Sequence, residues 1–169
     1  MSTATRRKSI DPADYGAVRI SAKADYAVRA ALTLAAADDE RPVKGERISE
    51  AQGIPLKFLE NILIDLRQAG LVASQRGPEG GYRLDGSPEK ITVADVIRAV
   101  DGPLASVRGG RPEEAAYEGP AAELQTVWIA LRSGIRGVLE HVTLADVVSG
   151  SIPTHVAELA REPDAWTRR

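Results

Sequence analysis

Residues 53–82 read GIPLKFLENILIDLRQAGLVASQRGPEGGY, and this stretch decides the fold of the 169-residue chain. Its first half carries an apolar stripe at helical spacing, made of Leu56, Leu59, Leu63 and Leu66 and widened by Phe58 and Ile62. Pro55 suits the first turn of a helix, and Gly70 suits the left-handed residue that ends one. The pattern predicts an α-helix with one face on a hydrophobic core.

The opposite face of this predicted helix is mostly polar. Lys57, Glu60, Asn61 and Ile64 follow one another at spacings that place them on one side. Such a face is either an ordinary solvated surface or a surface that reads a partner. The residues that follow the helix favour the second interpretation.

Two short strand-like runs, residues 71–75 and 82–84, flank the glycine- and proline-rich segment 76–81. This arrangement is typical of a β-hairpin, and Arg76 begins its tip. A tight turn without a function is the alternative. A polar helix followed by a hairpin with a basic tip predicts a winged helix-turn-helix, whose helix enters the major groove of DNA.

The same residues resemble the Rrf-type family of bacterial regulators, the IscR/NsrR/CymR-like proteins. The resemblance rests on GIPLKFLENIL and LRQAGLVASQRGPEGGY, continues in ITVADVIRAVDGPL and VTLADVV, and spans residues 19–148. It implies a mainly α-helical fold with a small β-hairpin wing and a long C-terminal dimerisation helix. It also implies a homodimeric repressor on a pseudo-palindromic operator in double-stranded DNA.

The resemblance implies a set of DNA-contacting positions: Ser21, Lys23, Lys57, Glu60, Asn61, Arg76, Gly77, Gly80, Gly81 and Tyr82. Lys57 suits guanine or phosphate, whereas Glu60 accepts only from donors such as the cytosine amino group and repels phosphate. Asn61 stands where the family commonly has the longer Gln. Arg76 is expected in the minor groove or on phosphate, the glycines shape the tip, and Tyr82 braces it.

Composition limits the other interpretations. The net charge is −2, and neither half of the chain is strongly basic, so DNA affinity has to come from local placement and from doubling of the site. No apolar run is long enough to span a membrane, and no secretory signal follows the basic residues 6–8. We expect a cytoplasmic protein with no membrane partner.

Cysteine is absent, and only two histidines are present. Disulfides, thiolate nucleophiles and cysteine-ligated clusters are therefore excluded, and we expect no metal and no cofactor. Cluster-binding members of the family carry three cysteines in the segment that corresponds to residues 101–120, which we expect to be a loop. No phosphate-binding, dinucleotide-binding or hydrolase motif occurs, so an enzyme is not expected.

Five segments are predicted. Residues 1–18 form a flexible arm that either follows a minor groove or is a tail without a role, and residues 19–100 form the DNA-binding domain. Within this domain we expect helices over 21–37, with Ser21 as its cap, over 46–52, with Ile48 and Ala51 inward, and from Thr92 to Val100. The loop 101–120 follows, then a dimerisation segment over 121–149 and a weakly patterned tail over 150–169.

The longest predicted helix covers residues 121–142. Its apolar residues follow a heptad spacing: Leu124, Trp128, Leu131, Ile135, Val138 and Val142. Gly134 and Gly137 are costly in a helix unless another helix crosses closely. We expect this helix to form the dimer with its two-fold mate, although packing within one chain is the alternative. A short helix is expected after Thr143.

Two inputs could control the regulator. One is a small-molecule effector that binds in a cavity beside the long helix, with Trp128 and Tyr117 as lining residues. The other is a regulatory protein partner. A different class of function is also open. The chain could be a winged-helix protein-interaction module that has lost DNA reading, which the near-neutral charge favours and the basic residues Lys57 and Arg76 disfavour.

Overall fold

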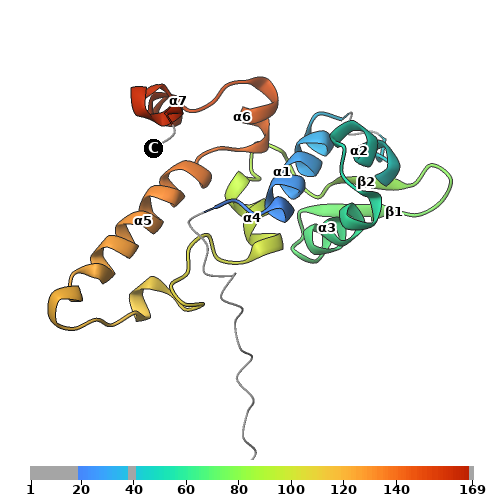
Figure 1. Cartoon of the computed structure of the whole chain (residues 1–169). Coiled ribbons are helices and arrows are strands. Elements are labelled where there is room, and N and C mark those ends of the chain that lie inside the picture. Colours follow the sequence, from blue (N-terminus) through green and yellow to red (C-terminus); the bar gives the residue numbers. More distant parts are fainter. Residues whose placement is uncertain (1–18, 38–40, 168–169) are drawn as a thin grey trace, which may run out of the picture.

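The computed structural model describes residues 19–37 and 41–167; the predicted arm over residues 1–18 lies outside them. Figure 1 shows the order of the elements along the chain. They are α1 (Ala22–Ala35), α2 (Gly45–Gln52), α3 (Leu56–Gln68), β1 (Val72–Gln75), β2 (Gly81–Leu84), α4 (Val93–Asp101), η2 (Pro112–Glu114), η3 (Gly119–Ala121), α5 (Leu124–Leu139), α6 (Leu144–Ser149), α7 (Thr154–Arg161) and η4 (Pro163–Trp166). The predicted fold class, mainly α with a β-hairpin, is confirmed.

The hydrophobic core lies where α1 packs against α3, α4 and α6. The helix α1 buries a row of small residues, Ala24, Ala27, Ala30 and Ala31, which lets its neighbours approach closely. The helix α3 buries Leu59, Ile62, Leu63 and Leu66 against it. This stripe is the one that the sequence predicts, except that Leu56 and Phe58 at its start are 37% and 41% exposed.

The hairpin pairs β1 with β2 in antiparallel register, with Val72 opposite Leu84 and Gln75 opposite Gly81. A third backbone segment joins this sheet, because Val43 and Tyr82 exchange both backbone hydrogen bonds, each at 2.8 Å. Val43 comes just before α2. The base of the wing is therefore tied to the start of the helix-turn-helix.

The helices α4 and α6 begin with matching capping boxes. Thr92 and Thr143 each accept a hydrogen bond from a backbone N–H three residues on, and Asp95 and Asp146 return the contact. Both starts were predicted from the sequence. The two threonines also pair across an isolated β-bridge, so α6 packs on the bundle of α1 to α4 and Leu144 is fully buried in its core.

The long helix α5 is shorter than predicted, since it covers Leu124–Leu139 and not residues 121–142. Val142 lies beyond its end, is buried, and accepts a hydrogen bond from the Val93 N–H (2.9 Å). The prediction that Val142 extends the heptad seam is therefore wrong, because that side chain belongs to the core of its own chain. The inward prediction for Ala51 on α2 is also wrong, since Ala51 is exposed.

Figure 1 shows α5 standing away from the bundle of α1 to α4, joined to it through the segment that contains η2 and through α6. No residue of α5 is buried within the chain, although the helix is rich in apolar residues. Residues 150–167 are more regular than predicted, since they form α7 and η4. No helix in the described part of the chain is long and apolar enough to cross a membrane.

Candidate nucleic-acid interface

The polar face of α3 is fully presented to solvent. Lys57, Glu60 and Asn61 are exposed, and within the described residues none of their side chains has a hydrogen-bond or ion-pair partner. Ile64 continues the face and is 42% exposed. These three polar side chains have free donors and acceptors and lie next to one another on a rigid helix. They can reach base edges in the major groove of DNA, which is wide enough to admit an α-helix.

The turn between α2 and α3 fixes the direction of this face. Gly53 adopts the left-handed conformation (φ 62°, ψ 35°), as its predicted role at the end of α2 requires. The Ser49 hydroxyl donates to the Ile54 carbonyl (2.6 Å), and the Ile54 N–H donates to the Ser49 carbonyl (3.0 Å). The two helices of the motif are thereby locked together.

A polar network between α1 and the end of α2 holds the same turn in place. The Arg29 guanidinium donates to the backbone carbonyl of Gln52 and to its side-chain oxygen (3.2 Å). Gln52 in turn donates to the Thr33 hydroxyl (2.9 Å). Sequence reasoning missed these three residues, because contacts between separate helices leave no periodic pattern.

The tip of the wing carries an exposed arginine on a tight turn. Arg76 has no side-chain partner among the described residues, and the turn after it closes through a hydrogen bond from the Gly80 N–H to the Gly77 carbonyl (2.9 Å). A Cβ atom on Gly80 would lie 2.4 Å from the Gln75 carbonyl oxygen. Only glycine therefore fits at Gly80, which keeps the tip narrow.

The remaining wing residues lie at its base. Gly81 has φ 156°, and a Cβ atom there would lie 2.5 Å from the Val43 carbonyl oxygen. Tyr82 is half-buried against the core, beside Gly45. The structure thus places Tyr82 where it braces the hairpin against α2, below the tip. Arg67 of α3 adds a further tie, from its Nη1 to the Ser74 hydroxyl (3.2 Å).

Ser21 and Lys23 are occupied within the chain. The Ser21 hydroxyl caps α1 by accepting from the Ala24 N–H (2.9 Å) and donates to Asp101 Oδ2 (2.5 Å). Lys23 Nζ lies 2.7 Å from Asp65 Oδ2 and donates to the Val100 carbonyl (3.0 Å). Their predicted contacts with phosphate stay predictions, and such contacts would compete with these bonds.

Three of the six predicted dimerisation residues line an open, mainly apolar groove of about 870 Å³ between α5 and the bundle, whereas Leu124, Trp128 and Val142 do not. Leu131, Ile135 and Val138 contribute to one wall, and Ala24 and Ile97 to the other. Gly134 is part of the same wall, and a Cβ atom there would meet nothing within 4 Å. The close contact expected at Gly134 is therefore absent within one chain.

The segment between α4 and α5 does not contain the donors that an iron–sulfur cluster needs. The chain has no cysteine, and no group of three or more His, Asp or Glu side chains gathers in the described residues in a way that could hold a metal ion. Glu113 pairs with Arg132, and hydrogen bonding lowers the pKa of its carboxyl group. The residues present do not fit a cysteine-ligated cluster.

Comparison with known proteins adds sequence relationships to this geometry. Residues 20–150 match the Rrf2 family, described as an iron-dependent transcriptional regulator. A Mycobacterium tuberculosis (strain H37Rv) protein named as a helix-turn-helix transcriptional regulator is 52% identical over 143 residues, which cover 85% of this chain and 89% of that protein. The regulator IscR of Serratia proteamaculans is 40% identical over 141 residues, covering 83% and 85%.

Solved structures agree with these relationships. The structure of CymR, the global cysteine regulator of B. subtilis, superposes with a TM-score of 0.67 at 33% identity and covers 78% of this chain and 97% of that one. The structure of T. potens IscR gives a TM-score of 0.65 at 34% identity, covering 79% and 88%. Sequence and fold thus point to the same group of regulators.

Proposed function

We propose that this chain, which belongs to the Rrf2 family of transcriptional regulators, is a homodimeric repressor that reads a pseudo-palindromic operator without an iron–sulfur cluster. One observation carries the proposal: the unpartnered row Lys57, Glu60 and Asn61 lies on a rigid helix beside a wing that ends in the free cation Arg76. The arrangement suits a helix in the major groove and an arginine on the adjacent backbone or minor groove.

The residues have different roles in this proposal. Lys57 and Arg76 supply positive charge close to the phosphates, and Asn61 supplies both a donor and an acceptor to a base edge. Glu60 cannot bind phosphate, so it selects among bases by accepting from an exocyclic amino group. The negative net charge of the chain keeps non-specific affinity low, and these few side chains therefore determine where the protein binds.

The second half of the proposal is the dimer. No residue of α5 is buried, and its apolar side chains form one wall of an open groove, so one chain leaves this apolar surface without a partner. We infer that the α5 helix of a second copy occupies this groove, with Gly134 at the close crossing. Two copies present two recognition helices to one operator, which multiplies a modest affinity for each half-site.

The donor set argues for regulation without a cluster. The family description mentions iron, yet the segment 102–112 offers neither cysteine nor histidine. DNA binding in this proposal depends only on the folded dimer, and the protein acts in the cytoplasm where operator DNA lies. Because a dimer that covers a promoter excludes polymerase, repression is the output.

The test is a fluorescence-anisotropy titration of the purified, metal-free protein against duplexes that tile the DNA upstream of its own gene, with scrambled duplexes at two salt concentrations. We expect one tile to bind tightly without any cofactor. The variant Leu131→Asp should be monomeric and bind that tile about 100-fold or more weakly. Equal affinity for all tiles and scrambled duplexes, with a folded dimer, overturns the proposal.

A further inference from the structure

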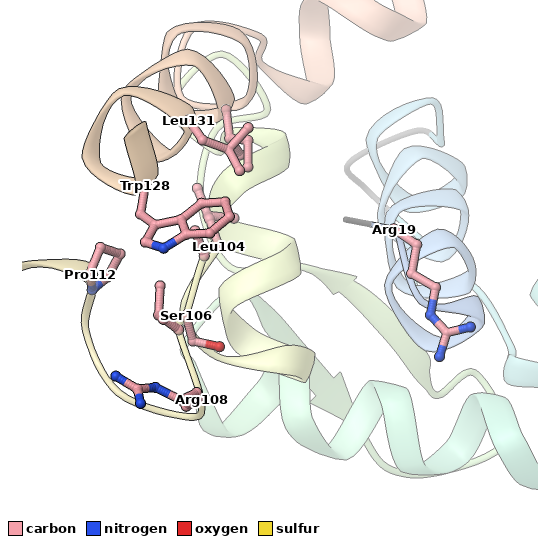
Figure 2. A pocket seen from close by; sticks show the side chains of 10 residues that line it. Arg19, Leu104, Ser106, Arg108, Pro112, Trp128 and Leu131 are labelled. Carbon is pink, nitrogen blue, oxygen red and sulfur yellow. The ribbon is translucent and has the colours of Figure 1, made fainter. Parts of the chain in front are cut away.

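A second cavity, of about 380 Å³, lies between α5 and the loop that follows α4. It adjoins the apolar groove, since Arg19, Leu104, Leu131 and Ile135 line both. Ten residues line it, mainly from the run 104–108 on one side and from Trp128, Leu131 and Ile135 on the other. Figure 2 shows the Trp128 ring above Ser106 and Arg108, with Pro112 beside them and Arg19 on the opposite side near α1. The volume is within the range of pockets that bind small molecules.

The loop is held in place although it is rich in glycine. Val107 and Gly110 exchange two backbone hydrogen bonds (2.9 and 3.0 Å) around a two-residue turn. The Gln125 side chain of α5 donates to the carbonyls of Glu113 (3.0 Å) and Ala115 (2.8 Å), further along the same segment. Pro112 is buried. The cavity is therefore preformed between the loop and α5.

Arg108 occupies a conformation that an arginine rarely adopts. Its φ is 53°, and among the described residues it alone, apart from glycines, has a positive φ. The left-handed conformation costs a residue with a Cβ about 1 kcal/mol or more, and Gly, Asn or Asp is the usual choice there. The guanidinium stacks over the Tyr117 ring (5.7 Å), and Tyr117 accepts a hydrogen bond from Trp128 Nε1 (3.0 Å).

The charges of the lining have one sign. The lining includes Arg19 and Arg108, and none of the lining residues carries a carboxylate. Two acids of the same segment are engaged elsewhere, since Glu113 pairs with Arg132 and Glu114 accepts from the Arg111 N–H (3.5 Å). An arginine beside an apolar chamber binds a planar carboxylate well, because the guanidinium donates two parallel hydrogen bonds to it.

We propose that this cavity is the effector site of the regulator and that its ligand is a small carboxylic acid with an aromatic or branched aliphatic body. The carboxylate pairs with Arg108, and the body packs on Val107, Pro112 and Trp128, which line this cavity but not the groove that the second copy occupies. The two arginines lie on opposite sides of the site (Figure 2), which suits a single negative charge at one end of an apolar molecule better than a compact dianion.

The site is connected to the recognition helix through short contacts. The loop begins directly after α4, whose last residues hold the start of α1 through the Asp101–Ser21 hydrogen bond and the Val100 carbonyl. Lys23 continues the connection to Asp65 on α3. Occupation of the cavity thus shifts the position of α3 relative to α5 and changes operator affinity, an effect that rests on the proposed function.

The two tryptophans of the chain allow a direct test. Trp166 is 85% exposed and distant in sequence, so Trp166→Phe leaves Trp128 as the fluorescence probe in the full-length protein. Phenylacetate and 4-methylpentanoate are titrated into it without DNA, against their neutral amides and inorganic phosphate. We expect saturable quenching or a spectral shift of the Trp128 fluorescence with at least one of the acids. The amides should bind at least tenfold more weakly, and phosphate should not bind.

Two variants separate binding from folding. Arg108→Asn suits the left-handed turn, so it should keep or raise the melting temperature while it weakens acid binding at least tenfold. Arg111→Gln, on the same loop but outside the cavity lining, should change neither the melting temperature nor the affinity for the acid. No saturable response to either acid, equal binding of the amides, tighter binding of phosphate, or unchanged affinity in Arg108→Asn would each overturn the ligand assignment.

The regulatory part is measured separately. The bound acid should change the affinity of the wild-type protein for its operator duplex at least fivefold, and Arg108→Asn should abolish this change. Acid binding without any effect on operator affinity would overturn the effector role and leave the ligand site. Absence of sequence-preferring DNA binding both with and without the acid, while acid binding is intact, would instead contradict the proposed function.

Discussion

The ammonium group of Lys23 lies 2.7 Å from the carboxylate of Asp65, and this ion pair joins α1 to the recognition helix α3. The two side chains are about one-third exposed, at 35% and 30%. Lys23 also donates to the Val100 carbonyl at the end of α4. Lys23, at the start of α1, therefore contacts two other helices, α3 and α4.

The pair should contribute modestly to stability. Solvent screening limits partly exposed ion pairs to roughly 0.2–1 kcal/mol, so a double-mutant cycle of Lys23→Met and Asp65→Asn should give a coupling energy in this range. Urea unfolding of the four proteins measures it. Lys23→Met should leave the salt dependence of DNA binding unchanged. A slope reduced by about 2, one contact for each subunit of the dimer, would show instead that Lys23 contacts phosphate.

Replacement of Arg76 should weaken DNA binding for all sequences alike. Arg76→Ala removes one cation from each of the two wing tips of the dimer, so the slope of log affinity against log salt should fall by about 2. Anisotropy titrations from low to physiological salt give this slope. Arg161→Ala, on exposed α7, is the matched control. An unchanged slope would favour the protein-interaction module over a DNA reader.

Glu60→Gln should raise affinity and lower selectivity. The change removes a negative charge near the phosphates and gives the side chain a donor, so more than one base becomes acceptable at the contacted position. We expect tighter binding to scrambled DNA and a specificity ratio reduced by about 1–3 kcal/mol. Competition titrations with single-base operator variants measure it. Retention of the full ratio would exclude Glu60 from base reading.

Gly134→Ala distinguishes an open helix face from a helix crossing. In a solvated helix the change should add about 0.8–1.0 kcal/mol of stability, because alanine is the better helix former. At a close crossing the added methyl group clashes, and we expect at least a tenfold weaker dimer by sedimentation equilibrium. Ser133→Ala, one residue away and exposed, is the control. If Gly134→Ala dimerises as tightly as the wild type, the α5 helix of the second copy does not cross at Gly134.

Acid should remove the contribution of the α6 cap. Hydrogen bonds from the Thr143 backbone and side chain lower the pKa of Asp146 below its ordinary value. Because the folded pKa is the lower one, this stabilisation is present above the unfolded pKa of about 3.9 and is lost as pH falls through the folded pKa. Asp146→Asn should lower the melting temperature at pH 7, and the difference should shrink below pH about 4. A constant difference would contradict this.

Local patterns in the sequence predicted most of the DNA-binding unit. The stripe on α3, the left-handed Gly53 and Gly70, and the cap residues Thr92 and Thr143 each depend on neighbours within a few residues. Such features can be predicted from the sequence because helix and turn geometry determine which positions face the same way. The exposed set Lys57, Glu60 and Asn61 follows from the same periodicity.

Features that depend on contacts between distant segments were not predictable. Val142 fits a heptad spacing, but its backbone pairs with α4, so the helix stops at Leu139 and the side chain enters the core. The network of Arg29, Gln52 and Thr33 joins α1 to the turn before α3 and has no periodic pattern. The same holds for the pairing of Lys23 with Asp65.

The most direct test of the account is selection of binding sites from a random duplex pool by the purified protein, with chelator present and no cofactor added. The account predicts enrichment of one motif made of two inverted half-sites, with a centre-to-centre spacing near one or two turns of DNA. A folded dimer that enriches no motif over several rounds would contradict it, because the exposed face of α3 would then read no sequence.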